Sequence, residues 1–152
     1  MNSLIICLLL SLTTVSSDFF IPTLKANWFQ ANEFCNSIEM KLASVPNKTV
    51  HDELVNFMKQ SDKFSYKGRY WLGASDLGEN GTYTWVANGR MMTFNNWQQN
   101  RPNYTDPFNR CLEIAHWPSA GWNWTWDNSN CYDQRFYFVC EKGIKQNCIE
   151  EF

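Results

Sequence analysis

Hydrophobic positions in the first part of the chain follow a helical period. Between Leu24 and Ile38 the apolar residues recur every three or four positions, which predicts an amphipathic helix. A second amphipathic helix is expected from Asn47 to Ser61, with Asn47 or Thr49 as its N-terminal cap. The residues predicted to face inward from it are Val50, Leu54, Phe57 and Met58.

After Lys63 the pattern changes to short apolar runs separated by Asn/Gly turns, which predicts strands. The expected strands in this part are Tyr70–Leu72, Tyr83–Val86, Cys111–Trp117, Trp122–Trp126 and Phe136–Cys140. One further short strand, Leu42–Val45, is expected between the two helices. Residues 94–110 form a long polar stretch with two prolines, and an ordered loop of that length is usually functional. Helices followed by strands indicate an α+β fold with antiparallel sheets.

The N-terminal segment predicts secretion. Residues 4–12 form a nine-residue apolar core, too short for a bilayer, and the small residues Val15 and Ser17 follow it. We therefore expect a signal peptide over residues 1–17, one domain over 18–142 and a tail over 143–152. Four Asn-x-Thr sequons add to the expectation of a secreted glycoprotein: Asn47, Asn80, Asn103 and Asn123.

Composition narrows the function. A net charge of −2 argues against nucleic-acid binding, and an aromatic content of 16% excludes a disordered chain. No catalytic motif is present, so we expect a non-enzyme. We interpret His51 as a solvated helix residue and His116 as a packed polar one.

Cysteine usage fits an oxidising compartment. Cleavage before Asp18 removes Cys7 and leaves five cysteines, which lack the short spacings of a zinc site and predict disulfides. Because five is an odd number, one cysteine is left over, and we assign this role to Cys148 in the tail. It either links two chains in an oligomer or stays a free or capped thiol.

Several motifs resemble, in order, the landmarks of the C-type lectin domain, most of all its small secreted arthropod members. They are Trp28-Phe-x-Ala31 with Cys35, Leu42-Ala-Ser, Tyr70-Trp-Leu-Gly73, Trp97 with Pro102-Asn103, Cys111-Leu-Glu113, Trp126 with Cys131, and Phe138-Val-Cys-Glu141. The resemblance implies two helices packed on antiparallel sheets with a long irregular loop region. It also implies two disulfides, Cys35–Cys140 and Cys111–Cys131.

The resemblance further implies calcium-dependent sugar binding, in which oxygen ligands hold both the ion and vicinal hydroxyls. The matching positions are Arg101, Pro102 and Asn103, then Asn109, then Asp127 and Asn128. Arg101 places a cation where an oxygen ligand belongs, and only Asp127 carries negative charge. Asp76 matches an acid of an accessory calcium site, but Tyr104 and Arg110 occupy other ligand positions there. These departures argue against calcium, and its role stays open.

Two further features offer alternatives for sugar contact. Trp122, Trp124 and Trp126 alternate along one strand and are predicted to share one face, with Asn123, Thr125 and Asp127 on the other. Trp126 is expected in the core, whereas Trp122 and Trp124 are either core residues or an aromatic platform. Arg101 and Arg110 either attract acidic glycans or are solvated loop cations.

We therefore expect a secreted carbohydrate-binding protein, galactose- or mannose-type, in innate immune recognition or a secreted fluid. Its partner would be a glycan or glycoprotein, and its calcium site is degenerate. The candidate binding residues are Arg101, Asn103, Asn109, Asp127, Asn128, Trp122 and Trp124; the candidate calcium ligands are Asn103, Asn109, Asp127 and Asn128. The alternative function is a calcium-independent domain that binds a protein partner through the long loop.

Overall fold

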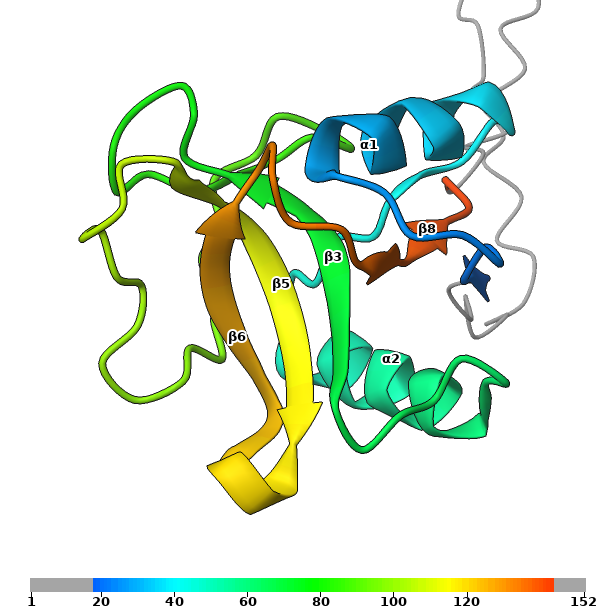
Figure 1. Ribbon diagram of the computed structural model, residues 1–152. Coiled ribbons are helices and arrows are strands. Elements are labelled where there is room, and N and C mark those ends of the chain that lie inside the picture. Colours follow the sequence, from blue (N-terminus) through cyan, green and yellow to red (C-terminus); the bar gives the residue numbers. More distant parts are fainter. Residues whose placement is uncertain (1–17, 144–152) are drawn as a thin grey trace, which may run out of the picture.

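A computed structural model describes residues 18–143 as two helices and two antiparallel sheets (Figure 1). The helices are α1 (Trp28–Ser37) and α2 (Lys48–Gln60). The larger sheet has the order β4 (Thr84–Trp85), β3 (Gly68–Ser75), β5 (Asn109–Trp117), β6 (Trp122–Asn130), with β7 (Tyr137–Phe138) parallel to β3. The smaller sheet has the order β1 (Phe19–Phe20), β8 (Cys140–Glu141), β2 (Lys41–Leu42). A short 3-10 turn, η1 (Pro118–Ala120), joins β5 to β6. The predicted α+β architecture is confirmed.

Asparagine side chains fix where both helices begin. Asn27 accepts the Gln30 N–H at 2.9 Å, and the Gln30 side chain in turn accepts the Asn27 N–H, so α1 starts later than the predicted Leu24. Asn47 accepts the Val50 N–H at 2.9 Å, which confirms it as the cap of α2.

Each helix packs on a different face of the larger sheet. Residues of α2 such as Leu54 and Met58 share a core with Tyr70 and Leu72 of β3. The second core contains Ala31 and Cys35 of α1 together with Trp71 of β3. Trp71 lies between Tyr70 and Leu72 in the strand, so its side chain points to the opposite face of the sheet. Because residues from both faces are buried, β3 forms the centre of the fold.

Two disulfides and a close backbone contact hold the periphery. Cys35–Cys140 ties α1 to β8, and Cys111–Cys131 ties β5 to the segment after β6, which confirms both implied pairs. Gly73 of β3 lies against the end of β2: a Cβ there would lie 2.5 Å from the Leu42 carbonyl oxygen. The absence of a side chain is therefore required at this position.

The predicted signal peptide (1–17) and nearly all of the predicted tail, Cys148 included, lie outside the described residues. The domain boundaries and any oligomer formed through Cys148 therefore stay predictions. Within residues 18–143, neither helix has the length and apolar character needed to cross a membrane.

Candidate functional site

The long loop between residues 94 and 108 runs beside β6 (Figure 1). Backbone hydrogen bonds fasten its first part to Trp126: the Trp126 N–H donates to Asn96 at 2.8 Å, and the Gln98 N–H donates to the Trp126 carbonyl at 2.9 Å. This attachment positions the following residues, Arg101 to Asn103, against the outer side of β6.

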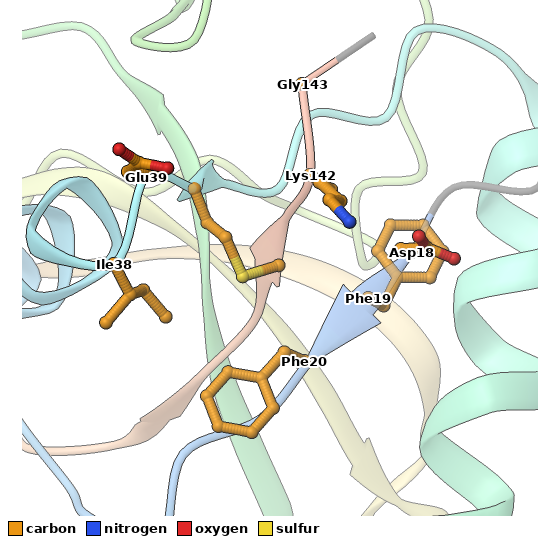
Figure 2. A pocket seen from close by; sticks show the side chains of 8 residues that line it. Asp18, Phe19, Phe20, Ile38, Glu39, Lys142 and Gly143 are labelled. Carbon is orange, nitrogen blue, oxygen red and sulfur yellow. The ribbon is translucent and has the colours of Figure 1, made fainter. Parts of the chain in front are cut away.

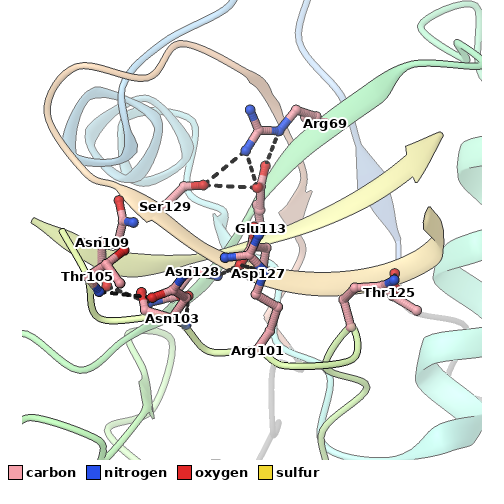
Figure 3. A network of polar contacts seen from close by, with 11 residues as sticks. Arg69, Arg101, Asn103, Thr105, Asn109, Glu113, Thr125, Asp127, Asn128 and Ser129 are labelled. Atoms are coloured by element: carbon pink, nitrogen blue, oxygen red, sulfur yellow. Dashed lines mark hydrogen bonds and ion pairs between the residues drawn. The ribbon is translucent and has the colours of Figure 1, made fainter. Parts of the chain in front are cut away.

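Arg101 pairs with the buried carboxylate of Asp127, with Nε 3.3 Å from Oδ1 (Figure 3). Burial raises the pKa of Asp127, and the positive charge of Arg101 opposes that rise. Asp127 is only 6% exposed, so its charge is balanced mainly by this guanidinium. The expectation that Arg101 is a solvated cation is wrong.

Asn128 is fully occupied by backbone groups of the neighbouring segments. Its Oδ1 accepts the Asn103 N–H at 2.7 Å, and its Nδ2 donates to the carbonyls of Asn103 and Asn109 at 2.8 Å each. The Asn103 side chain accepts the Thr105 N–H at 2.9 Å within the loop. These amides therefore stabilise the loop (Figure 3).

Two more buried acids have arginine partners. Arg110 donates to Asp76 at 2.8 Å, and Asp76 also accepts the Gly81 N–H at 2.8 Å. Arg110 is therefore a structural ion-pair partner, and the expectation of a solvated cation is wrong for it too. Glu113 pairs with Arg69 at 2.9 Å and with Ser129, an arrangement that no sequence motif indicates. Burial raises the pKa of Glu113, and Arg69 acts in the opposite direction.

These contacts test the implied calcium site. A calcium ion at the loop would need the side-chain oxygens of Asp127 and Asn128 as ligands. Both are already engaged, because the Asp127 oxygen pairs with Arg101 and the Asn128 oxygen accepts a backbone N–H. Within residues 18–143, no group of three or more His, Cys, Asp or Glu residues is arranged to hold a metal. The residues present do not fit calcium, because fixed guanidinium groups already neutralise the acids.

The three tryptophans of β6 do not share a face. Trp124 has a φ of 57° and is the extra residue of a bulge, because β6 shifts register where β5 continues from Ala115 to His116. Trp124 (4% exposed) and Trp126 (fully buried) belong to the α2 core. The bulge leaves Trp122 on the opposite face with Thr125 and Asp127, so the shared-face prediction is wrong.

Both histidines belong to the folded core. His51 is 7% exposed, with its ring 6.1 Å from Phe94 and 6.0 Å from Trp126, so the interpretation of a solvated residue is wrong. His116 stacks on Trp124 at 4.4 Å, which agrees with a packed polar role. Burial lowers the pKa of both imidazoles, which favours their neutral forms.

The sequon asparagines differ in exposure. Asn47, Asn80 and Asn123 are exposed, whereas Asn103 is partly buried. Glycosylation at each of them stays a prediction.

A separate hollow lies between β1 and the turn after α1 (Figure 2). It is lined by Asp18, Phe19, Phe20, Ile38, Glu39, Met40, Lys142 and Gly143. The hollow is lined in part by β1 of the smaller sheet, and none of the predicted site residues lines it. We therefore place the candidate site at the long loop and the outer face of β6.

Comparison with known proteins agrees with this geometry. The family model "Lectin C-type domain" matches residues 24–142. The chain belongs to the C-type lectin family. Among its relatives is C-type lectin mosGCTL-7 of Aedes aegypti, which is 47% identical over 138 residues, 91% of each chain. Salivary C-type lectin 2 of Aedes albopictus is 30% identical over 130 residues, 85% of each chain.

A solved structure supports the fold of this C-type lectin domain. The Ca²⁺-independent C-type lectin SPL-2 from Saxidomus purpuratus matches with a TM-score of 0.69 at 23% identity, covering 83% of this chain and 86% of that one. At this identity the likeness shows the fold alone. The relatives are lectins, a family of non-enzymatic binding proteins.

Proposed function

We propose that this C-type lectin is a secreted, non-catalytic glycan-binding protein whose recognition does not use calcium. The observation that carries the proposal is the pairing of Arg101 with Asp127, the only acid at the matched ligand positions. A lectin that still relied on calcium there would need that acid free. The structural neighbour SPL-2 is described as a Ca²⁺-independent C-type lectin, which supports the view that this fold is compatible with calcium independence.

Sugar contact is proposed at the outer side of the long loop. Arg101 and Trp122 are both partly exposed, and the guanidinium carbon lies 5.7 Å from the indole centroid. A planar cation beside an aromatic face offers hydrogen-bond donors next to a stacking surface, which suits a pyranose ring. The surface is supported by contacts among the other candidate residues. Asn128 hydrogen-bonds to the backbone of Asn103 and Asn109, and Asp127 pairs with Arg101. Galactose- and mannose-type ligands are both compatible with this surface.

Secretion is supported by the predicted signal peptide and by the salivary relative. A role in innate immune recognition or in a secreted fluid follows as part of the proposal.

The direct test is a glycan array probed with the secreted protein in EDTA and again in calcium. We expect the same glycans to be retained in both conditions, and Arg101→Ala to weaken retention. Arg90→Ala is the matched control, because Arg90 is exposed and outside this surface. Retention that EDTA abolishes would contradict calcium independence, and an array without any retained glycan would contradict glycan binding.

A second candidate function is binding of a protein partner through the long loop. It is favoured by two exposed aromatic side chains in this loop, Tyr104 at 38% and Phe108 at 58%. Exposed aromatic residues are enriched at protein interfaces. Loss of a captured protein on Phe108→Ala, with glycan retention unchanged, would favour this candidate.

A further inference from the structure

The outer face of β5 and β6 carries a row of four side chains, of which Lys67 and Trp117 are outside the set predicted from sequence. Lys67 precedes β3, Trp117 ends β5, Trp122 begins β6, and Arg101 lies in the long loop. The Lys67 Nζ lies 5.1 Å from the Trp117 ring centroid, and the Arg101 guanidinium lies 5.7 Å from that of Trp122. Trp117 and Trp122 are register partners across the two strands. We name this row the tryptophan strip.

Strand register explains why the strip forms. Glu113, Ala115 and Trp117 alternate along β5 and pair with Asp127, Thr125 and Trp122 of β6. Directly paired side chains on one face lie about 5 Å apart at their Cβ atoms. Without the bulge at Trp124, Trp122 would point into the α2 core, so the bulge creates the strip.

The strip is held in place on its long-loop side. The Thr125 hydroxyl donates to Gln98 Oε1 at 2.6 Å, and Gln98 Nε2 donates to the Gly121 carbonyl at 3.3 Å. Arg101 is anchored by Asp127. A ligand therefore meets a largely preformed surface, which lowers the entropic cost of binding.

Charge on the strip indicates the class of ligand. The arginines near this face have acidic partners: Arg69 pairs with Glu113, and Arg101 pairs with Asp127. Lys67, in contrast, forms no ion pair with any of residues 18–143 and is exposed. Its ammonium group lies over the Trp117 ring, which is 40% exposed, and has no carboxylate partner among these residues, so it is available to an anion.

We propose that the tryptophan strip binds a saccharide bearing a negative charge, a carboxylate or a sulfate group. The C–H face of a pyranose packs on the electron-rich indole faces, while the anionic group pairs with Lys67. The proposal rests on the proposed glycan-binding function and adds a ligand class and a surface beyond the loop.

The test uses indole Nε1–H signals in ¹H–¹⁵N NMR spectra of the folded protein in EDTA. The probes are 3′-sialyllactose (carboxylate), 6-O-sulfated lactose (sulfate) and neutral lactose. We expect the Trp117 and Trp122 signals to shift with an acidic probe at concentrations where lactose has little effect. The two acidic probes then distinguish the carboxylate from the sulfate as the preferred anion.

Substitutions locate the binding. Trp117→Ala should weaken acidic-probe binding about tenfold. Lys67→Met, which keeps the apolar stem, should weaken it about threefold and remove both the preference over lactose and the salt dependence. Trp117→Phe keeps an aromatic ring and should retain part of the affinity if Trp117→Ala fails to fold.

Two variants serve as matched controls. Lys25→Met removes a lysine that also lies 5.1 Å from an aromatic centroid, that of Tyr137. Tyr132→Ala removes an aromatic residue that is 56% exposed outside the strip. Both should bind the acidic probe like the parent protein.

The outcomes separate this inference from the proposed function. Equal binding of lactose and the acidic probes, or acidic-probe binding unchanged in Trp117→Ala and Lys67→Met, would overturn the strip while glycan binding stands. A failure of both acidic probes to bind would also overturn it. Absence of every retained glycan on the array would instead overturn the proposed function itself.

Discussion

The Arg101 guanidinium lies 3.3 Å from the Asp127 carboxylate, and both residues occupy positions that the family resemblance assigns to calcium ligands. Arg110 repeats this relationship with Asp76 at 2.8 Å. A guanidinium is always charged and presents several donors, so it supplies to a carboxylate both the positive charge and the directional contacts that an ion would supply. The two guanidinium groups therefore neutralise the buried carboxylates of Asp127 and Asp76.

Removing Arg110 should destabilise the fold strongly. Asp76 is fully buried, so Arg110→Gln leaves its carboxylate without a cationic partner. We expect the free energy of unfolding to fall by about 3–5 kcal/mol in urea denaturation. The double variant Asp76→Asn/Arg110→Gln should recover part of this loss, whereas Arg90→Gln at an exposed site should change little. A loss below about 1 kcal/mol for Arg110→Gln would mean that the pair is no better than a surface ion pair.

Replacing Arg101 by glutamate should introduce a calcium response. The variant places two carboxylates side by side, which repel each other unless a cation lies between them. We expect calcium to raise the melting temperature of Arg101→Glu and to leave that of the parent unchanged. Arg101→Gln, which removes the cation without adding an acid, is the control. If calcium stabilises Arg101→Gln equally well, charge at position 101 does not decide metal binding.

The two buried histidines should make the fold acid-sensitive. Their pKa values lie below the ordinary 6.5, so the unfolded chain takes up protons first as pH falls. Their contribution to stability is thus complete above about pH 6.5 and is lost as pH falls toward the folded-state pKa values. For His51, burial lowers the pKa, Asp52 opposes this shift and Lys48 adds to it; for His116, burial and Lys59 both lower it.

His51→Phe tests this acid sensitivity, because it keeps an aromatic ring against Phe94 and Trp126 and removes the titrating group. The difference between urea midpoints at about pH 7.5 and about pH 5 should shrink in this variant. An unchanged difference would assign the acid sensitivity to other groups.

Asn47 combines a helix cap with a sequon, and two variants separate these roles. Asn47→Ala removes the acceptor for the Val50 N–H and should cost about 1 kcal/mol of stability. Asn47→Asp keeps the capping oxygen, and Thr49→Ala removes the sequon while leaving Asn47 in place. Comparison of unfolding free energies after enzymatic deglycosylation isolates the cap. Equal stability of Asn47→Ala and Asn47→Asp would contradict the capping role.

Features that depend on local sequence, or that the family resemblance implies, could be predicted well. The cap at Asn47 follows from the residues next to it, and the Cys35–Cys140 and Cys111–Cys131 bonds follow from the family resemblance. The strands were predicted near their observed positions, but the bounds differ: those matching β2, β4 and β7 were predicted too long, and those matching β3, β5 and β6 too short. β6 continues four residues beyond Trp126, because its polar residues there are buried by ion pairs and amide contacts.

Several features that depend on distant residues could not be predicted. The family resemblance places Asp76 and Arg110, 34 positions apart, at one accessory calcium site, but it does not indicate that they form a direct ion pair. The bulge places Trp124, a non-glycine residue, at positive φ and turns the Trp122 side chain to the opposite face of the sheet. The sequence pattern shows only a strict alternation of tryptophans and polar residues, which gives no sign of a bulge. His51 resembles a surface residue because Asp52 and Glu53 follow it, yet its ring packs against the start of the long loop.

Calcium titration by calorimetry, with melting temperatures measured in calcium and in EDTA, tests whether arginines replace calcium in this domain. If arginines hold the acids in place of an ion, the folded protein gives no saturable heat with calcium, and its melting temperature is the same in both buffers. Saturable binding at millimolar or lower calcium, together with a melting temperature that EDTA lowers, would contradict the account.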